Sequence, residues 1–261
     1  MTLSHKHLQV RLLNTFIIFL KVFGLGLLLF PFNFACAEIH GTITGTTDYI
    51  WRFYSKSNGN PAIQANLDYQ HSSGLYIGAT ASNFSIGPSE LEEDEVFPDS
   101  AQVEVSPYAG WSYKFADDWR VDMQYSRYFY DDKIYALDGD YNEFYLFLHY
   151  KDLLSLQTSY IDDFYGLGGD SLFYELTGRY PLNDFLEVSA GFGYGQTENA
   201  IKGNYEYWNA GLTGRYKFIA LDLRYYDSKE IYLVDTLEEN LTPDHPAPIK
   251  ATVVFSLSIG F

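Results

Sequence analysis

The sequence predicts an all-β fold: a transmembrane antiparallel up-and-down β-barrel of about 12 strands, preceded by a cleaved signal peptide. Three observations lead to this prediction. Segments of about ten residues alternate apolar and polar side chains, which is the period of a strand. The connectors between them alternate in length. The first 37 residues have the composition of an export signal.

The export signal comes first along the chain. Residues 1–37 contain no Asp or Glu, residues 22–34 carry no charge, and Ala35-Cys36-Ala37 places small residues at the first and third positions. This order is typical of a secretory signal peptide and predicts cleavage before Glu38, which leaves residues 38–261 as the barrel domain. An uncleaved anchor over residues 12–34 is the alternative, although Lys21 interrupts it.

The mature chain is strongly acidic. Cleavage removes three of the 17 basic residues and none of the 34 acidic ones, so an excess of 20 negative charges remains. The single cysteine is also removed, which excludes disulfides. Nucleic acid is not expected as a partner, because phosphates need Lys and Arg. No phosphate loop or metal motif occurs, so no cofactor is predicted.

Twelve strands follow in order from Glu38. We expect them at about residues 38–52, 62–71, 75–85, 101–114, 119–130, 141–150, 154–165, 171–180, 185–197, 205–217, 220–227 and 251–261. Long connectors cover 53–61, 86–100, 131–140, 166–170, 198–204 and 228–248, and short turns lie between them. This sorting, with both termini on the short-turn side, is typical of an outer-membrane barrel and has no reason to occur in a soluble sandwich.

The two faces of each strand predict a lipid-facing exterior and a wet lumen. Trp208, Ala210 and Leu212 alternate with Asn209 and Thr213, for example. Charged inward positions would lie in the lumen, since Arg or Lys turned to lipid at mid-depth costs about 2–4 kcal/mol. The candidate lumen residues are Asp48, Arg52, Asp68, Glu104, Glu143, Glu175, Arg179 and Arg215, joined by the uncharged Gln64 and Asn66.

Asp48, Arg52 and Asp68 are the best candidates for a charge cluster. They could set ion preference at a constriction, or they could form a salt-bridge network that stiffens the barrel, and the sequence leaves both interpretations open.

The last strand predicts a partner in assembly. Phe255, Leu257, Ile259 and Phe261 share one face, and the chain stops on an aromatic residue. This ending resembles the terminal strand that the barrel-assembly machinery reads in bacterial outer membranes. The other expected partners are outer-membrane lipid and lipopolysaccharide.

Two further stretches suggest chemistry. The loop 86–100 holds Glu92, Glu93 and Asp94 among other acidic residues, and carboxylates could bridge divalent cations to lipopolysaccharide. Its spacing matches no Ca²⁺ loop, so a solvated acidic loop is the simpler interpretation. The histidines lack a placed nucleophile, so no enzyme is predicted.

Blocks in the first third of the mature chain resemble the TorF-type putative porins, a proteobacterial family long catalogued as of unknown function. The matching residues are 47–52, Ser55, 61–64, 67–69, 74–78, Ser82, Asn83, Glu104, Tyr108 and Gly110. The chain departs from the family pattern at Phe53, Lys56, Ala65-Asn66 and Ser106. The resemblance implies an outer-membrane barrel that acts as a channel, without an agreed substrate. We therefore expect passive diffusion of small polar solutes or ions, with an occluded structural or adhesive barrel as the alternative and a lipase or protease barrel behind both.

Overall fold

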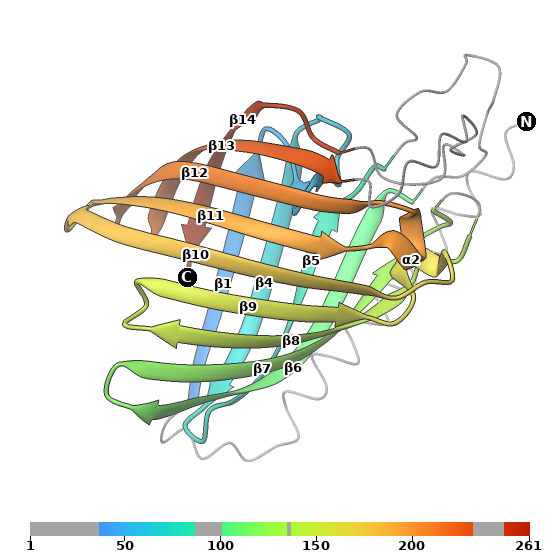
Figure 1. Cartoon of the computed structure of the whole chain (residues 1–261). Coiled ribbons are helices and arrows are strands. Elements are labelled where there is room, and N and C mark those ends of the chain that lie inside the picture. The colour runs from blue at the N-terminus through green and yellow to red at the C-terminus, as the bar shows by residue number, and fades with distance from the viewer. Residues whose placement is uncertain (1–36, 87–100, 135–136, 232–247) are drawn as a thin grey trace, which may run out of the picture. The chain divides into compact units, whose positions relative to one another are not determined.

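The computed structural model describes residues 37–86, 101–134, 137–231 and 248–261, which form a closed antiparallel barrel of twelve strands (Figure 1). The wall consists of β1 (Ala37–Thr46), β4 (Ala62–His71), β5 (Leu75–Asn83), β6 (Val103–Ala116), β7 (Trp119–Tyr130), β8 (Tyr141–Tyr150), β9 (Leu154–Ile161), β10 (Ser171–Asn183), β11 (Leu186–Gln196), β12 (Asn204–Tyr216), β13 (Ile219–Ile231) and β14 (Thr252–Gly260). The fold class and strand number predicted from the sequence are confirmed. The signal segment up to Cys36 and most of the acidic loop 86–100 lie outside the described residues. Within the described residues, no helix has the length and apolarity needed to cross a membrane.

β1 and β14 close the barrel. Thr42 lies opposite Gly260 and Thr46 opposite Ser256, and the amides of Gly41 and Phe261 each donate to the other's carbonyl. The Phe261 ring lies directly over Gly41, where an added Cβ would come within 2.3 Å of ring carbon Cε2. A side chain at this position would therefore have to displace the terminal ring from the seam.

Short turns connect the strands at the end where β1 begins and β14 stops. Between β8 and β9, Lys151 and Asp152 both have positive φ, at 52° and 55°. The Leu153 amide donates to the Tyr150 carbonyl at 3.0 Å, so these two residues are the centre of a tight turn whose twist matches that of the flanking strands. The long connectors join strand ends at the opposite end of the barrel, and the predicted alternation of short and long connectors is confirmed.

The exterior of the barrel is apolar. Val253, Phe255, Leu257, Ile259 and Phe261 along β14 are all exposed, and the other wall strands present exposed Ile, Leu, Val and aromatic side chains in the same way. A soluble monomer rarely exposes so continuous an apolar surface, whereas a barrel in a bilayer covers such a surface with the hydrocarbon chains of the lipid. Closing the sheet leaves no unpaired strand edge toward lipid.

Two predicted strands extend too far. The sequence favours a strand over 38–52, but the wall strand ends at Thr46, and the chain then turns inward. The alternating side chains continue past Thr46 to Tyr49 and Trp51, which is why the sequence predicts one long strand. The same alternation also suits the short hairpin that these residues form inside the lumen. Likewise, the strand predicted over residues 154–165 ends at Ile161, and the 3₁₀ turn η1 (Phe164–Gly166) follows it.

Candidate functional site: the lumen and its inner hairpin

Residues 47–57, here called the inner hairpin, fold into the barrel from the long-connector end. β2 (Ile50–Trp51) and β3 (Tyr54–Ser55) pair across a two-residue turn that begins at Arg52. Arg52 has a φ of 57°, a conformation usually left to glycine or asparagine. The contacts of its side chain hold the turn in that conformation.

Arg52 is the central cation of the site. Its Nη2 donates to Glu143 Oε1 on β8 and, at 2.8 Å, to Ser159 Oγ on β9. Its Nε lies 3.4 Å from Glu175 Oε1 on β10. The side chains of Arg52 and Glu143 are 2% and 0% exposed, so this ion pair is almost fully removed from water. It therefore ties the tip of the inner hairpin to the wall.

Lys56 makes the second buried ion pair. Its Nζ lies 2.5 Å from Glu104 Oε2 on β6, and Tyr49 and Tyr130 each donate a hydroxyl proton to the same carboxylate, at 3.0 and 2.7 Å. Burial lowers the pKa of Lys56 below its ordinary value, while the Glu104 carboxylate acts against that shift. The carboxylate is thus fully hydrogen-bonded, as a buried charge must be.

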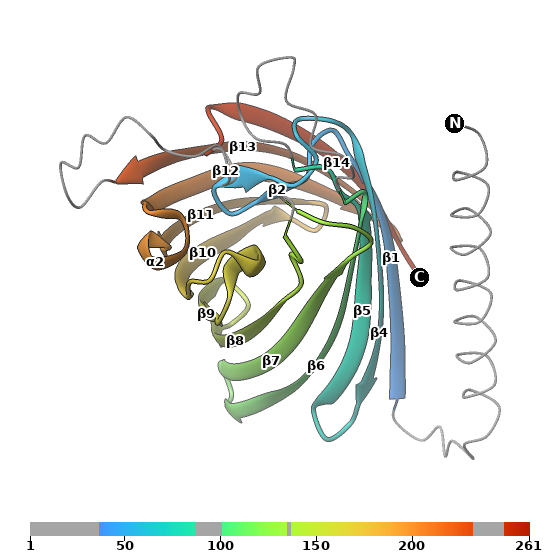
Figure 2. The same cartoon turned by 90° about the vertical axis from the view of Figure 1, so that its right-hand side faces the viewer.

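The inner hairpin reaches opposite walls of the barrel. Phe53 stacks on Tyr205 of β12 with ring centroids 4.0 Å apart, while Lys56 contacts β6, which lies half the ring of strands away. In Figure 2, which looks at the long-connector end, β2 lies within the ring of strands. The backbone carbonyl of Phe53 also accepts from the Ile249 amide at 2.7 Å, which fixes the inner hairpin to the segment before β14.

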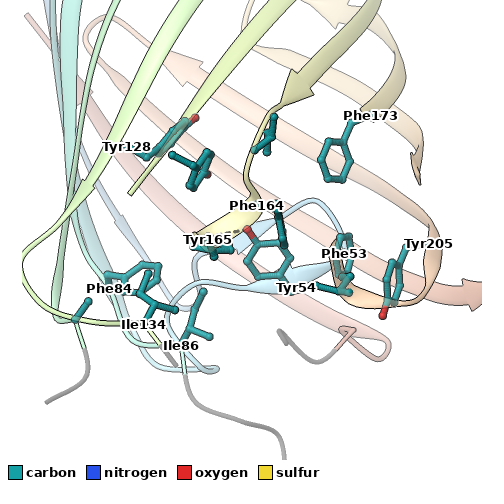
Figure 3. Close-up of a cluster of buried hydrophobic side chains, with 14 of the residues drawn as sticks. Phe53, Tyr54, Phe84, Ile86, Tyr128, Ile134, Phe164, Tyr165, Phe173 and Tyr205 are labelled. Carbon is teal, nitrogen blue, oxygen red and sulfur yellow. Dashed lines mark hydrogen bonds between the residues drawn. The ribbon is translucent and has the colours of Figure 1, made fainter. Parts of the chain in front are cut away.

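Aromatic side chains fill the space around the inner hairpin (Figure 3). Tyr54 and Tyr165 share a hydroxyl–hydroxyl hydrogen bond of 2.8 Å, and both residues are fully buried. The cluster contains Phe53, Tyr54, Phe84, Ile86, Ala101, Tyr128, Ile134, Tyr141, Ile161, Phe164, Tyr165, Phe173, Ile201, Tyr205 and Tyr207. Its members come from the inner hairpin, the long connectors and the adjoining strand ends. This aromatic cluster occupies part of the lumen near the long-connector end.

Between the cluster and the short turns lies a cavity with a volume of about 870 Å³. Its lining is dominated by hydroxyl and amide side chains, with Trp51 and Arg52 contributing from the inner hairpin. Toward the short turns the lining includes Gln70, Ser112 and Arg120. Many hydrogen-bonding side chains therefore line the lumen between the hairpin tip and the short turns.

The structure separates the predicted cluster of Asp48, Arg52 and Asp68. Asp48 accepts from Ser55 Oγ and Ser57 Oγ within the inner hairpin, at 2.6 and 2.8 Å. Asp68 lies on β4 in the cavity wall, where its Oδ2 is 3.4 Å from His40 Nδ1. Arg52 instead joins Glu143 and Glu175. The three residues belong to three different networks.

The remaining predicted lumen residues divide between the two ends. Glu104, Glu143 and Glu175 hold the inner hairpin, whereas Arg179 and Arg215 lie toward the short turns. Arg215 Nη1 is 3.4 Å from Glu187, and the Arg215 side chain is more than half exposed. Gln64 and Asn66 line the cavity as predicted.

One Ser–His pair occurs on the inner wall. His149 Nδ1 lies 2.8 Å from Ser155 Oγ, and Arg179 Nη1 donates to the same oxygen at 2.9 Å. Within the described residues, no carboxylate is hydrogen-bonded to His149 to orient it. The Arg179 charge would also oppose an imidazolium there, so the arrangement lacks the parts of a hydrolytic triad.

Sequence reasoning missed Lys56 and Trp51 as lumen residues. Lys56 fell in a segment predicted to be an outer loop, and Trp51 was assigned to a membrane interface. One signal was present: Lys56 is a basic residue in a strongly acidic chain at a position where it departs from the family pattern. Its ion pair with Glu104 spans 48 residues of sequence.

Comparison with known proteins identifies a family and a fold. A family model described as "Bacterial protein of unknown function (Gcw_chp)" matches residues 34–251. No curated protein matches the sequence. Among solved structures, the NanC porin is similar with a TM-score of 0.50 and 11% identity over 85% of this chain and 98% of that one. The KdgM porin gives 0.49 and 8% over 85% and 98%, and LpxR from Salmonella typhimurium gives 0.48 and 9% over 85% and 99%. At such identities the likeness concerns the fold alone.

Proposed function

This chain belongs to the Gcw_chp family, and because that family is of unknown function, we propose from the lumen itself that the protein is an outer-membrane porin-like channel for passive diffusion of small polar solutes or ions. The narrower TorF-type assignment, signal cleavage before Glu38, and contacts with lipopolysaccharide and the barrel-assembly machinery belong to the same proposal.

The observation that carries the proposal is a polar cavity of about 870 Å³ inside a closed barrel with an apolar exterior. Hydroxyl and amide groups along its wall can replace part of a solute's hydration shell, as pore linings do. Twelve strands enclose more room than an eight-stranded barrel, whose interior its own side chains fill. The similar fold of the NanC porin supports the same interpretation.

The aromatic cluster favours a second candidate, an occluded structural barrel. In the arrangement described here the inner hairpin lies inside the ring of strands, so the path through the barrel widens when the hairpin leaves its ion pairs. Two buried ion pairs and one stacked ring pair hold the hairpin in this position. We propose that it acts as a gate, which opens when these contacts break. A hydrolytic function is disfavoured by the incomplete Ser155–His149 arrangement.

Planar bilayers test the channel. Refolded protein that migrates differently on gels before and after boiling should give discrete conductance steps. Ser155→Ala should conduct like the wild type, because Ser155 belongs to neither the gate nor the cavity lining. Repeated silence from folded barrels, including variants with a loosened hairpin, would replace the channel with the occluded barrel.

A further inference from the structure

We propose that Arg179, on the inner face of β10, binds the carboxylate or phosphate group of a small anionic solute. This inference rests on the proposed channel function and names the class of solute for which the lumen holds a site. It follows from the charge partners of the inner-wall arginines, from the exposure of Arg179 and from the groups on the neighbouring strands.

Three other arginines on the inner wall have carboxylate partners. The ion pairs are Arg120 with Asp122, Arg215 with Glu187, and Arg224 with Asp222. Arg179 forms no ion pair among the residues that the structure describes, and its side chain makes one hydrogen bond, from Nη1 to Ser155 Oγ at 2.9 Å. Because a guanidinium carries five N–H donors, most of those on Arg179 are left for a solute.

Arg179 faces the lumen and is accessible from it. Leu176 and Tyr180 on the same strand are exposed on the outer face of the barrel. Side chains alternate along a strand, so Arg179 shares the inner face with Glu175, which lines the cavity. Arg179 is only partly buried, whereas the side chain of Arg52 is 2% exposed. A solute in the lumen can therefore reach the free N–H groups of Arg179.

The described residues supply no carboxylate partner for Arg179. Ser189, which is neutral, lies directly opposite Arg179 on β11. Glu175 lies four residues away along β10, which is about 13 Å in a strand. Glu187 lies diagonally across on β11, where its carboxylate is 3.4 Å from Arg215. The charge of Arg179 is therefore not neutralised by its neighbours on the wall.

The uncompensated charge selects the class of solute. A charged group in a partly buried position costs free energy unless an opposite charge meets it. The planar guanidinium matches the two oxygens of a carboxylate or phosphate, which it can bind with two parallel hydrogen bonds. A cationic solute is repelled by Arg179, and a neutral solute leaves its charge unpaired. Asp68 lies on β4, on the opposite side of the ring of strands, so an anion in the lumen is driven towards β10.

Nuclear magnetic resonance tests the site with inorganic phosphate as the probe. In ¹⁵N-arginine-labelled protein refolded in detergent, the Nε–H signal that is lost in Arg179→Gln belongs to Arg179. We expect phosphate, at constant ionic strength, to shift this signal saturably, and glucose to leave it unmoved. The Nε–H signal of Arg224 is an internal control, because that group already donates to Asp222 at 3.1 Å and should shift less.

Reversal potentials in planar bilayers measure the consequence for permeation. Arg179→Gln removes one positive charge from the lumen and should lower the ratio of chloride to potassium permeability about 2- to 5-fold, which is the effect of one charge about 4 Å from an ion in water. The matched control is Lys217→Gln, which removes the same charge from the turn between β12 and β13, where Lys217 lies over the Tyr216 ring. That variant should keep the wild-type ratio.

Each contrary outcome identifies what failed. A phosphate-insensitive Arg179 signal in folded protein, an equal shift with glucose, or an equal loss of chloride preference in Lys217→Gln overturns the anion site. Conductance in bilayers without any phosphate-dependent shift removes the site and leaves the channel. A saturable phosphate-dependent shift in a protein that never conducts retains the site and removes the channel.

Discussion

Replacing Arg52 with methionine should release the inner hairpin while leaving the barrel closed. Methionine fills part of the same volume but leaves Glu143, which is fully buried, without its cation. Removing one partner of a buried ion pair costs about 3–5 kcal/mol. At about 1.4 kcal/mol per factor of ten, the equilibrium between docked and released hairpin should shift by roughly two to three and a half orders of magnitude.

Hydrogen exchange measures this shift residue by residue. The Ser85 amide donates to the Lys56 carbonyl at 2.9 Å and the Ile249 amide to the Phe53 carbonyl at 2.7 Å, and both bonds join the hairpin to the rest of the barrel. In Arg52→Met these two amides should exchange faster, while amides in β8 and β10 keep their protection. Single-channel recordings should show more frequent openings.

Two further variants separate the ion pair from general damage. Adding Glu143→Gln to Arg52→Met removes the stranded carboxylate and should restore part of the protection, as a double-mutant cycle detects. Arg215→Met removes an exposed ion pair, worth about 0–1 kcal/mol, and should leave the exchange of these amides unchanged. Unchanged exchange at Ser85 and Ile249 in folded Arg52→Met would refute the assignment of Arg52 as the tether.

Three other predictions follow from the wall and its seam. Asp68→Asn should move the reversal potential in a salt gradient toward anions if Asp68 faces the permeation path; lower thermal stability with unchanged ion preference would mark it as a brace. Gly41→Val should weaken closure, because its side chain enters the space of the Phe261 ring, and the unboiled gel form should convert at lower temperature; full heat resistance would contradict this. Deleting Phe261, or changing Phe255 and Phe261 together to Ser, should block outer-membrane assembly more than the loss of apolar contacts warrants, measured by membrane fractionation; normal insertion would leave the strand a packing role only.

The sequence by itself determined the wall of the barrel. Strand positions, the order of short and long connectors, and the apolar outward face of β14 depend on a period of two along neighbouring residues. Lipid outside and water inside impose that period on every strand, so a local pattern is enough to predict it. The turns at Lys151-Asp152 and elsewhere are equally local.

Only the tertiary structure decided what occupies the lumen. Arg52 meets Glu143 across 91 residues of sequence, and Lys56 meets Glu104 across 48. Which inward residues meet depends on barrel closure, on strand register and on where the chain leaves the wall at Thr46. The alternating Tyr49 and Trp51 fit a wall strand and a lumen hairpin equally well in sequence. The buried carboxylates of β6 and β8 decide between the two, because Arg52 and Lys56 can reach them only from inside the barrel.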